Sequence, residues 1–416
     1  MSSSLHSDNK SVFVTAEEAI TAFQKGEILI LIDDEDRENE GDFVIAAEHT
    51  TPDVINFMAT HGRGLVCLSI TAERAKQLQL APMVSRNSAL MGTAFTESVD
   101  AVDGTTTGIS TYDRAVTVQR MIADDTAPED LARPGHLFPL VADPGGVLIR
   151  PGHTEAAVDI AKAAGLTPSG VLCEILDDDG TMARLPALIR IAEKFDLKIA
   201  SVQDIVNFRR KTEVLVDRKS VVKLPTNNGE FDLHFYENRL NRAEAHLAIT
   251  KGDLTDERPP LVRIHSECFT GDLLGSRRCD CGDQLDTAMA RIESEGRGAV
   301  LYLRQEGRGI GLANKILAYQ LQDAGKDTVE ANELLGFKAD LREYWFAAQM
   351  LKELGVDKVR LMTNNPKKVA ALNRHGIQVV ERIPIVIDAN PANAKYLRTK
   401  AKKLGHYLAA LPDGEE

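Results

Sequence analysis

The sequence predicts an α/β or α+β protein of two domains, each with a mixed β-sheet core packed with helices. With 416 residues, the chain is long enough for two or three domains that each bury a core. Short aliphatic runs typical of buried strands alternate in both halves with patterns typical of amphipathic helices. This pattern loosens near residues 200–210, so we predict one domain at 1–204 and a second at 205–416.

The composition argues against several classes of protein. Charged residues at 27% and hydrophobic residues at 43% are typical of an ordinary soluble protein, and no apolar run is long enough to span a bilayer. The net charge of −13 argues against nucleic-acid binding, which needs a basic face. The first ten residues lack the apolar segment of a signal peptide, and five cysteines in so long a chain favour metal binding over disulfides. We therefore expect a cytoplasmic protein that binds neither membrane nor nucleic acid.

The first half opens with a predicted helix and a predicted strand. Thr15 and Glu18 form a capping-box pattern before a helix that Gly26 would end, and aliphatic residues at 28–32 predict a buried strand. The acidic run DDEDRENEGD follows at 33–42. Such a run is usually a solvated loop, but this one follows a buried strand end, where α/β proteins place their sites. Its Arg and Gly among carboxylates suit a site for a hard cation and a sugar phosphate.

The tetrad Arg-Pro-Gly-His occurs twice, at 133–136 and 150–153. Each copy alone could be an ordinary Pro-Gly turn with an exposed His. After the second copy, however, Thr154 is the predicted N-cap of a helix over 155–165. A helix N-terminus beside an Arg readily binds anions.

Glu174 lies on an otherwise apolar strand predicted at 171–176. A carboxylate there is costly to bury without a partner, which favours a functional role. Cys67 and Cys173 have apolar neighbours and are predicted to be core residues.

These segments together resemble the family of 3,4-dihydroxy-2-butanone 4-phosphate synthases over roughly the first 200 residues. The matching motifs are DDEDRENEGD at 33–42, GISTYDRA at 108–115, RPGHLFPL at 133–140, RPGHTEA at 150–156 and CEIL at 173–176. That family converts D-ribulose 5-phosphate to 3,4-dihydroxy-2-butanone 4-phosphate and formate. The resemblance implies that Glu38 and His153 hold Mg²⁺ or Mn²⁺ and that His136 and Glu174 transfer protons, a task that suits both side chains. It also implies the substrate contacts Arg37, Glu38, Asp42, Arg150, Pro151, Gly152, His153, Thr154 and Glu174.

Three of the five cysteines cluster in the second half. Cys268, Cys279 and Cys281 follow the spacing C-x10-C-x-C, and in extended chain the last two thiols point to one face. A turn through 271–275 could bring Cys268 beside them. Three thiolates leave a fourth zinc position open, which is typical of catalytic zinc and would hold a water of lowered pKa. Inert core cysteines are the alternative, but the polar flanks of Arg-Cys-Asp-Cys-Gly fit a core poorly.

Strands and helices alternate through the second half, and Asn228-Gly229 predicts a hairpin turn. Apolar runs predict strands at 221–224, 231–235, 261–265, 299–303 and 359–362. Amphipathic patterns predict helices after the cysteines, at 312–323 with Ile316, Leu317 and Leu321 packed inward, at 340–354 with Asp340 as N-cap, and at 366–376 after the N-cap Asn365. Residues two apart do not share a helix face, so Asp340 and Arg342 should converge only because they start their helix.

The second half closely resembles GTP cyclohydrolase II, a zinc enzyme at the start of riboflavin synthesis. The matching segments are RIHSECFTGDLLGSRRCDCGDQL at 263–285, RQEGRGIG at 304–311, DTVEAN at 327–332, DLREY at 340–344 and TNNPKK at 363–368. That family hydrolyses GTP to 2,5-diamino-6-(5-phosphoribosylamino)pyrimidin-4(3H)-one, formate and pyrophosphate, with Mg²⁺ on the triphosphate. The resemblance implies the zinc ligands Cys268, Cys279 and Cys281, with Asp340 as proton acceptor and Arg342 as nucleophile. It implies the GTP contacts Arg263, Ile264, His265, Ser266, Glu267, Gln284, Glu306, Gly307, Arg308, Thr328, Thr363 and Lys368.

The resemblances predict a fused enzyme that makes both precursors of riboflavin from D-ribulose 5-phosphate and GTP, with one zinc ion per C-terminal domain. Two alternatives stay open: one half could be a non-catalytic scaffold, or the chain could be a zinc-stabilised nucleotide-binding regulator. Structural zinc usually has four protein ligands, so an open shell of three cysteines argues against the regulator. Related synthases are dimers with the active site near the subunit interface. We therefore expect a homodimer in which His136 could serve the neighbouring subunit.

Overall fold

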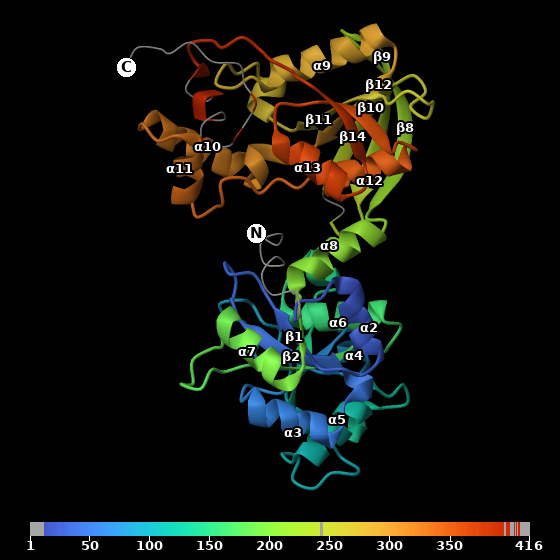
Figure 1. Ribbon diagram of the computed structural model, residues 1–416, viewed down its shortest axis with the longest axis vertical. Helices are drawn as coiled ribbons and strands as arrows, with labels where there is room; N and C mark the ends of the chain where they lie inside the picture. Colours follow the sequence, from blue (N-terminus) through green and yellow to red (C-terminus); the bar gives the residue numbers. More distant parts are fainter. Residues whose placement is uncertain are drawn as a thin grey trace. The chain divides into compact units, whose positions relative to one another are not determined.

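The structure, a computed structural model, describes residues 12–241, 244–394, 397–399, 403, 405 and 407 (Figure 1). The chain divides into two compact units, Met1–Thr212 and Glu213–Glu416. Each unit contains a mixed seven-stranded sheet packed with helices, which confirms the predicted fold class. The boundary predicted between 204 and 205 lies within helix α8 (Val202–Thr212), which the contacts group with the first unit. No described helix has the length and apolar character needed to cross a membrane.

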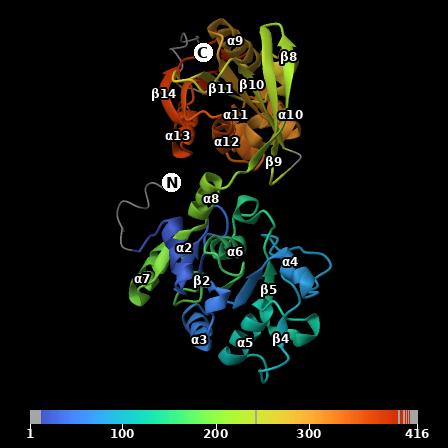
Figure 2. The same cartoon turned by 90° about the vertical axis from the view of Figure 1, so that its right-hand side faces the viewer.

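The sheet of the first unit is covered by helices on both faces (Figure 2). Its strand order is β4-β5-β3-β6-β2-β1-β7. The strands are β1 (Leu29–Ile32), β2 (Gly41–Ala46), β3 (Cys67–Ile70), β4 (Val99–Ala101), β5 (Leu131–Val141), β6 (Gly170–Glu174) and β7 (Lys198–Ser201). The other helices are α2 (Ala16–Gln24), α3 (Pro52–His61), α4 (Ala72–Gln77), α5 (Thr111–Ile122), α6 (His153–Ala163) and α7 (Leu185–Phe195).

Alternation along β1 explains why this strand is apolar throughout. Ile30 and Ile32 pack in one core with residues of α3, α5 and α7, whereas Leu29 and Leu31 pack in a second core with residues of α2, α6 and α8. The predicted capping box of Thr15 and Glu18 is present at the start of α2. Both predicted core cysteines, Cys67 and Cys173, are fully buried.

The start of helix α6 differs from its prediction. Helix α6 begins at His153, and its N-cap is Gly152 rather than Thr154. The Gly152 carbonyl accepts the first helical hydrogen bond, from Ala156 N at 3.0 Å, so Thr154 already lies inside the first turn. The helix therefore starts directly after the second Arg-Pro-Gly sequence.

The sheet of the second unit has the order β14-β13-β11-β12-β10-β9-β8. Its strands are β8 (Val216–Thr226), β9 (Gly229–Asn238), β10 (Ala245–Lys251), β11 (Leu261–Ser266), β12 (Gly298–Leu303), β13 (Lys358–Met362) and β14 (Gln378–Ile383). The predicted hairpin is confirmed, because β8 and β9 pair antiparallel around Asn227 and Asn228. The helices are α9 (Cys281–Glu295), α10 (Gly311–Asp323), α11 (Thr328–Leu334), α12 (Trp345–Glu353) and α13 (Pro366–Arg374).

Parallel pairing places three loops of the second unit at one edge of its sheet. Strand β11 pairs parallel with both β12 and β13, so the carboxyl ends of all three strands lie at that edge. Cys268, Glu306 and Thr363 each follow one of these strands directly. Side chains far apart in the sequence therefore meet where α/β proteins place their sites.

Two helices of the second unit differ from their predictions. Helix α12 begins at Trp345, so Asp340 is not its N-cap and residues 341–344 are not helical. Ile316 and Leu317 of α10 do not pack inward but are 44% and 45% exposed, and the buried residues of that helix are Lys315 and Ala318. The inner face of α10 borders the cysteine segment, where a polar side chain finds partners.

The core of the second unit gives a direct test of this packing. Leu301, in β12, is fully buried, so Leu301→Ala should lower the free energy of unfolding by about 2–5 kcal/mol. Leu317→Ala removes the same atoms from an exposed site and should change it by less than about 0.5 kcal/mol. Urea unfolding can be followed by the fluorescence of Trp345, the single tryptophan of the chain. Equal losses in the two variants would contradict the placement of these leucines.

Candidate active sites

The acidic loop of the first unit connects β1 to β2 and is organised by Asp33. The Asp33 carboxylate accepts hydrogen bonds from Glu38 N at 3.0 Å and Glu40 N at 2.9 Å, and it pairs with Arg37 Nη1 at 2.8 Å. The Asp33 side chain is fully buried. These bonds fold the run back on itself around Asp33, whereas Asp34, Glu35 and Asp36 remain exposed to solvent. No separate role was predicted for Asp33 from the sequence, although it directly follows a predicted strand.

His153 lies among carboxylates where the acidic loop meets α6. Glu38 Oε2 lies 3.5 Å from His153 Nδ1 and 2.9 Å from Arg37 Nη1. The hydrogen bond from His153, with Arg37 beside it, holds the pKa of Glu38 at about 2. Burial lowers the pKa of His153, but the Asp42 and Glu38 carboxylates outweigh it and raise the pKa to about 9. Burial raises the pKa of Asp42 to about 7.

This group of residues fits a divalent metal ion. Asp33, Glu38 and His153 each offer one ligand atom, and these atoms lie within 4.8 Å of one another. The Nε2 atom of His153 is buried and has no hydrogen-bond partner among the described residues. A protonated His between carboxylates marks a position for positive charge, and a metal ion binding there would displace that proton.

The N-terminus of α6 forms an anion site beside this group. Its N-cap, Gly152, offers no side-chain cap, so N–H groups of the first turn stay free. A Cβ on Gly152 would lie 2.8 Å from Arg37 Nη2 and 2.9 Å from Arg150 Nη1, so both guanidinium groups flank the helix start. Arg150 also pairs with Glu155 at 2.7 Å. Two Arg side chains at a helix N-terminus suit a phosphate.

Of the two predicted proton-transfer residues, one joins this site and the other does not. Glu174 ends β6 directly opposite Asp42 on β2, and its carboxylate accepts a hydrogen bond from Leu65 N at 2.8 Å. His136 lies on β5, and its Nδ1 is 2.7 Å from Asp100 Oδ2. Among the described residues, Asp100 is the hydrogen-bond partner of this side chain, which was not foreseen from the sequence.

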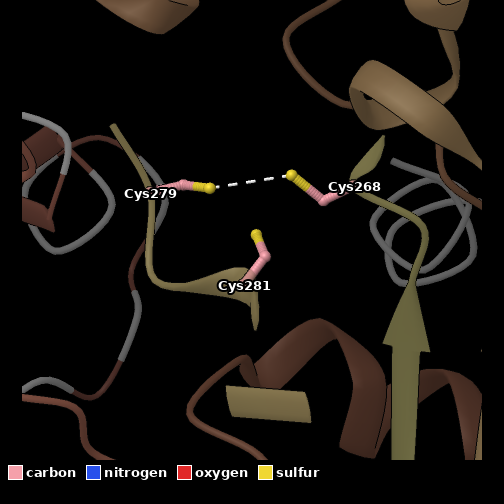
Figure 3. A group of neighbouring side chains, drawn as sticks. All are labelled: Cys268, Cys279 and Cys281. Carbon is pink, nitrogen blue, oxygen red and sulfur yellow. Dashed lines mark hydrogen bonds between the residues drawn. The ribbon is translucent and has the colours of Figure 1, made fainter. Parts of the chain in front are cut away.

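In the second unit the three predicted zinc ligands converge (Figure 3). Cys268 follows β11, and Cys279 and Cys281 lie at the start of α9. The Sγ atoms of Cys268 and Cys279 are 3.6 Å apart, and all three lie within 4.8 Å of one another. A Cβ on Gly271 would be 2.8 Å from Cys279 Sγ, so the predicted turn needs glycine at that position.

Of the three thiols, Cys268 has surroundings that favour the thiolate. Hydrogen bonds from Cys279 and Cys281, with the ammonium of Lys315 nearby, hold the pKa of Cys268 far below its ordinary value. The pKa of Cys279 is raised to about 11 by its hydrogen bond with Cys268. A thiolate beside two more thiols fits a zinc ion, because the metal displaces the remaining protons.

Asp272 fixes the loop that carries Cys268. Its carboxylate accepts hydrogen bonds from Cys268 N and Tyr302 Oη, each at 2.9 Å, and lies 3.0 Å from His265 Nε2. No role was predicted for Asp272 from the sequence. Its position four residues after Cys268, inside a one-turn helix, could be read only from the folded loop.

Nearly all predicted GTP contacts line one pocket beside the cysteines. Every one of them except Ile264 lines it, together with all three cysteines and Arg342. Residues that the sequence analysis had not named also line it, including Arg278, Asp280, Lys315, Tyr319 and Asn332. The pocket opens beside the cysteine sulfurs, so a bound nucleotide could present an atom to them.

Buried hydrogen bonds hold several of these polar side chains in place. Arg263 Nη2 donates to Gln284 Oε1 at 2.5 Å, and Gln284 Nε2 donates to Asp280 Oδ2 at 2.6 Å. Lys368 Nζ donates to Ile264 O at 2.8 Å. The walls of the pocket are therefore ordered by the protein itself, as preorganised binding requires.

Asp340 and Arg342 form a bidentate pair, although not at a helix start. Arg342 Nε donates to Asp340 Oδ1 at 2.8 Å, and Nη2 donates to Oδ2 at 2.7 Å. Burial raises the pKa of Asp340, but the hydrogen bonds from Arg342 outweigh it and lower the pKa to about 2. Because the segment before α12 is not helical, side chains two apart can turn toward each other.

Comparisons with known proteins match both halves. The family described as 3,4-dihydroxy-2-butanone 4-phosphate synthase matches residues 17–208, and the family described as GTP cyclohydrolase II matches residues 217–384. Riboflavin biosynthesis protein RibBA of Bacillus cereus is 55% identical over 397 residues, which cover 95% of this chain and all of that protein. RibBA of Bacillus mycoides is 54% identical with the same coverage.

Solved structures are also similar. RibBX from A. baumannii, described as a two-domain 3,4-dihydroxy-2-butanone 4-phosphate synthase, is 37% identical with a TM-score of 0.68, covering 90% of this chain and all of that one. A 3,4-dihydroxy-2-butanone 4-phosphate synthase in complex with two magnesium ions is 41% identical with a TM-score of 0.47. It covers 48% of this chain and 98% of that one.

Proposed function

Because the chain belongs to the 3,4-dihydroxy-2-butanone 4-phosphate synthase and GTP cyclohydrolase II families, fused as in RibBA, we propose here which residues carry each activity. The protein is a bifunctional enzyme of riboflavin biosynthesis with both activities. One converts D-ribulose 5-phosphate to 3,4-dihydroxy-2-butanone 4-phosphate and formate. The other hydrolyses GTP to the diaminopyrimidinone ribosyl phosphate, formate and pyrophosphate. We assign the first to residues 1–204 and the second to 205–416.

In the N-terminal domain, the metal ligands are Glu38 and His153, and Asp33 lies close enough to join them. Bound Mg²⁺ or Mn²⁺ would stabilise negative charge on the sugar oxygens. The phosphate binds Arg37, Arg150 and the free N–H groups after Gly152, with Pro151 and Thr154 on either side of the turn. Asp42 contacts the substrate beside Glu174, which transfers protons.

Removing divalent cations tests this metal site. EDTA should stop formate release from D-ribulose 5-phosphate, and added Mg²⁺ should restore it. His153→Ala should weaken Mn²⁺ binding at least about 10-fold, measured by the electron paramagnetic resonance of free Mn²⁺. His61→Ala, on α3 and outside this group, is the matched control. Wild-type Mn²⁺ affinity in His153→Ala would rule out the assigned ligand.

In the C-terminal domain, the convergence of Cys268, Cys279 and Cys281 beside the pocket carries the proposal. Zinc held by three thiolates keeps a fourth position for activating solvent. The proposed GTP contacts are the eleven implied residues that line the pocket; the twelfth, Ile264, is fully buried outside that lining, and its carbonyl accepts a hydrogen bond from Lys368. Glu306 already accepts hydrogen bonds from Phe269 N and Gly307 N, so we assign its carboxylate to ordering this turn. Arg308 remains available for phosphate.

Asp340 and Arg342 are the remaining residues that we assign to the cyclohydrolase site. Asp340 is a carboxylate at neutral pH and is assigned as the proton acceptor by the family resemblance, although its pairing with Arg342 makes it a weak base. Arg342 lines the pocket and is oriented by both oxygens of Asp340. A guanidinium normally keeps its protons, so its use as a nucleophile needs an acceptor such as this neighbour. Mg²⁺ on the triphosphate would assist the departure of pyrophosphate.

We further propose a cytoplasmic homodimer. None of the five cysteines forms a disulfide, which supports a reducing compartment. His136 is 43% exposed at its side chain and bonds to Asp100, not to the Glu38 and His153 group. This supports a role for His136 in completing the site of a neighbouring subunit.

Separate assays of formate release from D-ribulose 5-phosphate and from GTP test the double function, together with the zinc content of the protein. We expect product from both substrates and one zinc ion per chain. Folded protein with both metals that acts on one substrate alone would show that the other half is a scaffold. A fourth protein ligand on the zinc would favour the regulator.

A further inference from the structure

One cation lies against the cysteine cluster and has no role in the assignments above. Lys315 projects from α10 toward the pocket and is 9% exposed. Its Nζ donates to Cys268 Sγ at 3.2 Å and to Glu306 Oε1 at 2.8 Å. It therefore links the cysteine segment after β11 to the turn after β12.

The partners of Lys315 also contact the segment that carries Cys268. Glu306 Oε1 bonds to Lys315, while its Oε2 accepts from Phe269 N at 2.6 Å, directly next to Cys268. The Tyr319 ring lies 5.8 Å from Nζ and supplies an aromatic face. An ammonium group is costly to bury without partners, and these partners offset that cost. A simple ion pair with Glu306 would not require contact with a sulfur.

The chemistry of a zinc ion bound by three thiolates explains why a cationic side chain suits the position of Lys315. Three thiolates and Zn²⁺ carry a net negative charge, and electron donation by sulfur weakens the zinc as a Lewis acid. A hydrogen bond from a cation withdraws electron density from the sulfur that accepts it. Groups around the ligands of a metal commonly tune it in this way.

We propose that Lys315 is a positioning residue of the cyclohydrolase site that tunes the zinc through Cys268 and locks Glu306 against the cysteine loop. This inference rests on the proposed zinc site. It assigns Lys315 a role distinct from GTP binding, because its Nζ is already engaged by a sulfur and a carboxylate. The effect should therefore appear in kcat more than in the KM for GTP.

The test uses the full-length protein with cobalt in place of zinc. Lys315→Met removes the charge and keeps the stem, and Lys326→Met, at an exposed lysine after α10, is the control. Loss of the hydrogen bond makes the sulfur more electron-rich, so the sulfur-to-cobalt charge-transfer band of Lys315→Met should move to lower energy. Its d–d bands, which report tetrahedral geometry, should stay in place. With zinc, kcat for formate release from GTP should fall about 10-fold.

The outcomes separate this inference from the proposed zinc site. If the wild-type cobalt protein lacks a charge-transfer band, the three-cysteine site itself is wrong. If that band is present and unchanged in Lys315→Met, Lys315 does not act on the sulfur. Loss of the metal, or a shift of the d–d bands, would show that Lys315 maintains the geometry of the site instead of tuning it. Wild-type spectra and activity in Lys326→Met complete the comparison.

Discussion

Cys279→Ser should abolish formate release from GTP and leave the conversion of D-ribulose 5-phosphate unchanged. The variant replaces one of three converging thiols by a hydroxyl, which is a poor zinc ligand. Changes around the ligands alone cost about 10- to 100-fold, so losing a ligand should cost at least about 100-fold in activity. Formate assays with each substrate and a zinc analysis by atomic absorption measure the effect.

Cys67→Ser provides the matched control for that experiment. Cys67 is buried in the first unit, outside the cysteine group, so its replacement should leave the zinc content and the GTP activity unaltered. If Cys279→Ser lost both activities while its folded state stayed intact, the assignment of one activity to each domain would be wrong. Full GTP activity without zinc would refute the metal site.

Glu174→Ala should have the opposite effect, stopping the sugar-phosphate reaction and sparing GTP hydrolysis. Glu174 ends β6 opposite Asp42 and is the carboxylate assigned to proton transfer there. Loss of a general acid or base costs about 10²- to 10⁴-fold in rate, which the formate assay resolves easily. Glu73→Ala, at an exposed glutamate of α4, controls for the change in charge. An active Glu174→Ala enzyme would remove this residue from the mechanism.

Mixing Glu174→Ala with His136→Ala extends this test to the homodimer. If His136 serves the neighbouring subunit, each mixed dimer contains one intact site, and random mixing should restore about a quarter of the wild-type activity. If His136 acts within its own subunit, mixing restores nothing. Sedimentation analysis would show directly whether the protein is a dimer.

Several parts of both sites were predictable because they depend on local chemistry. The capping box at Thr15, the hairpin at Asn228-Gly229 and the N-cap Asn365 all follow from hydrogen bonds between residues close in sequence. The cysteine spacing indicated a three-thiol group, and the structure brings these thiols together. Family motifs added the residues that no local pattern could assign.

Other predictions failed where tertiary contacts decide the outcome. Asp340 and Arg342 have a helical pattern around them, yet α12 starts at Trp345 and the two side chains pair in a non-helical segment. Ile316 and Leu317 were expected inside, but the inner face of α10 meets the polar pocket, so Lys315 points inward. The periodicity of a sequence shows which residues share a face of a helix. It does not show which face the rest of the protein covers.

By itself, the sequence determined the mixed α and β architecture, the three cysteines as a metal group, and the acidic and Arg-Pro-Gly-His segments as candidate sites. Only the tertiary structure decided that Asp33, Asp272 and Lys315 support these sites and that His136 lies with Asp100. The reason is physical: Lys315 and His136 meet partners 47 and 36 residues away, which only helix packing and strand pairing bring close, while Asp33 and Asp272 bond within loops whose shape depends on the strands that hold their ends. The spacing of residues along the chain does not show which of these segments come together.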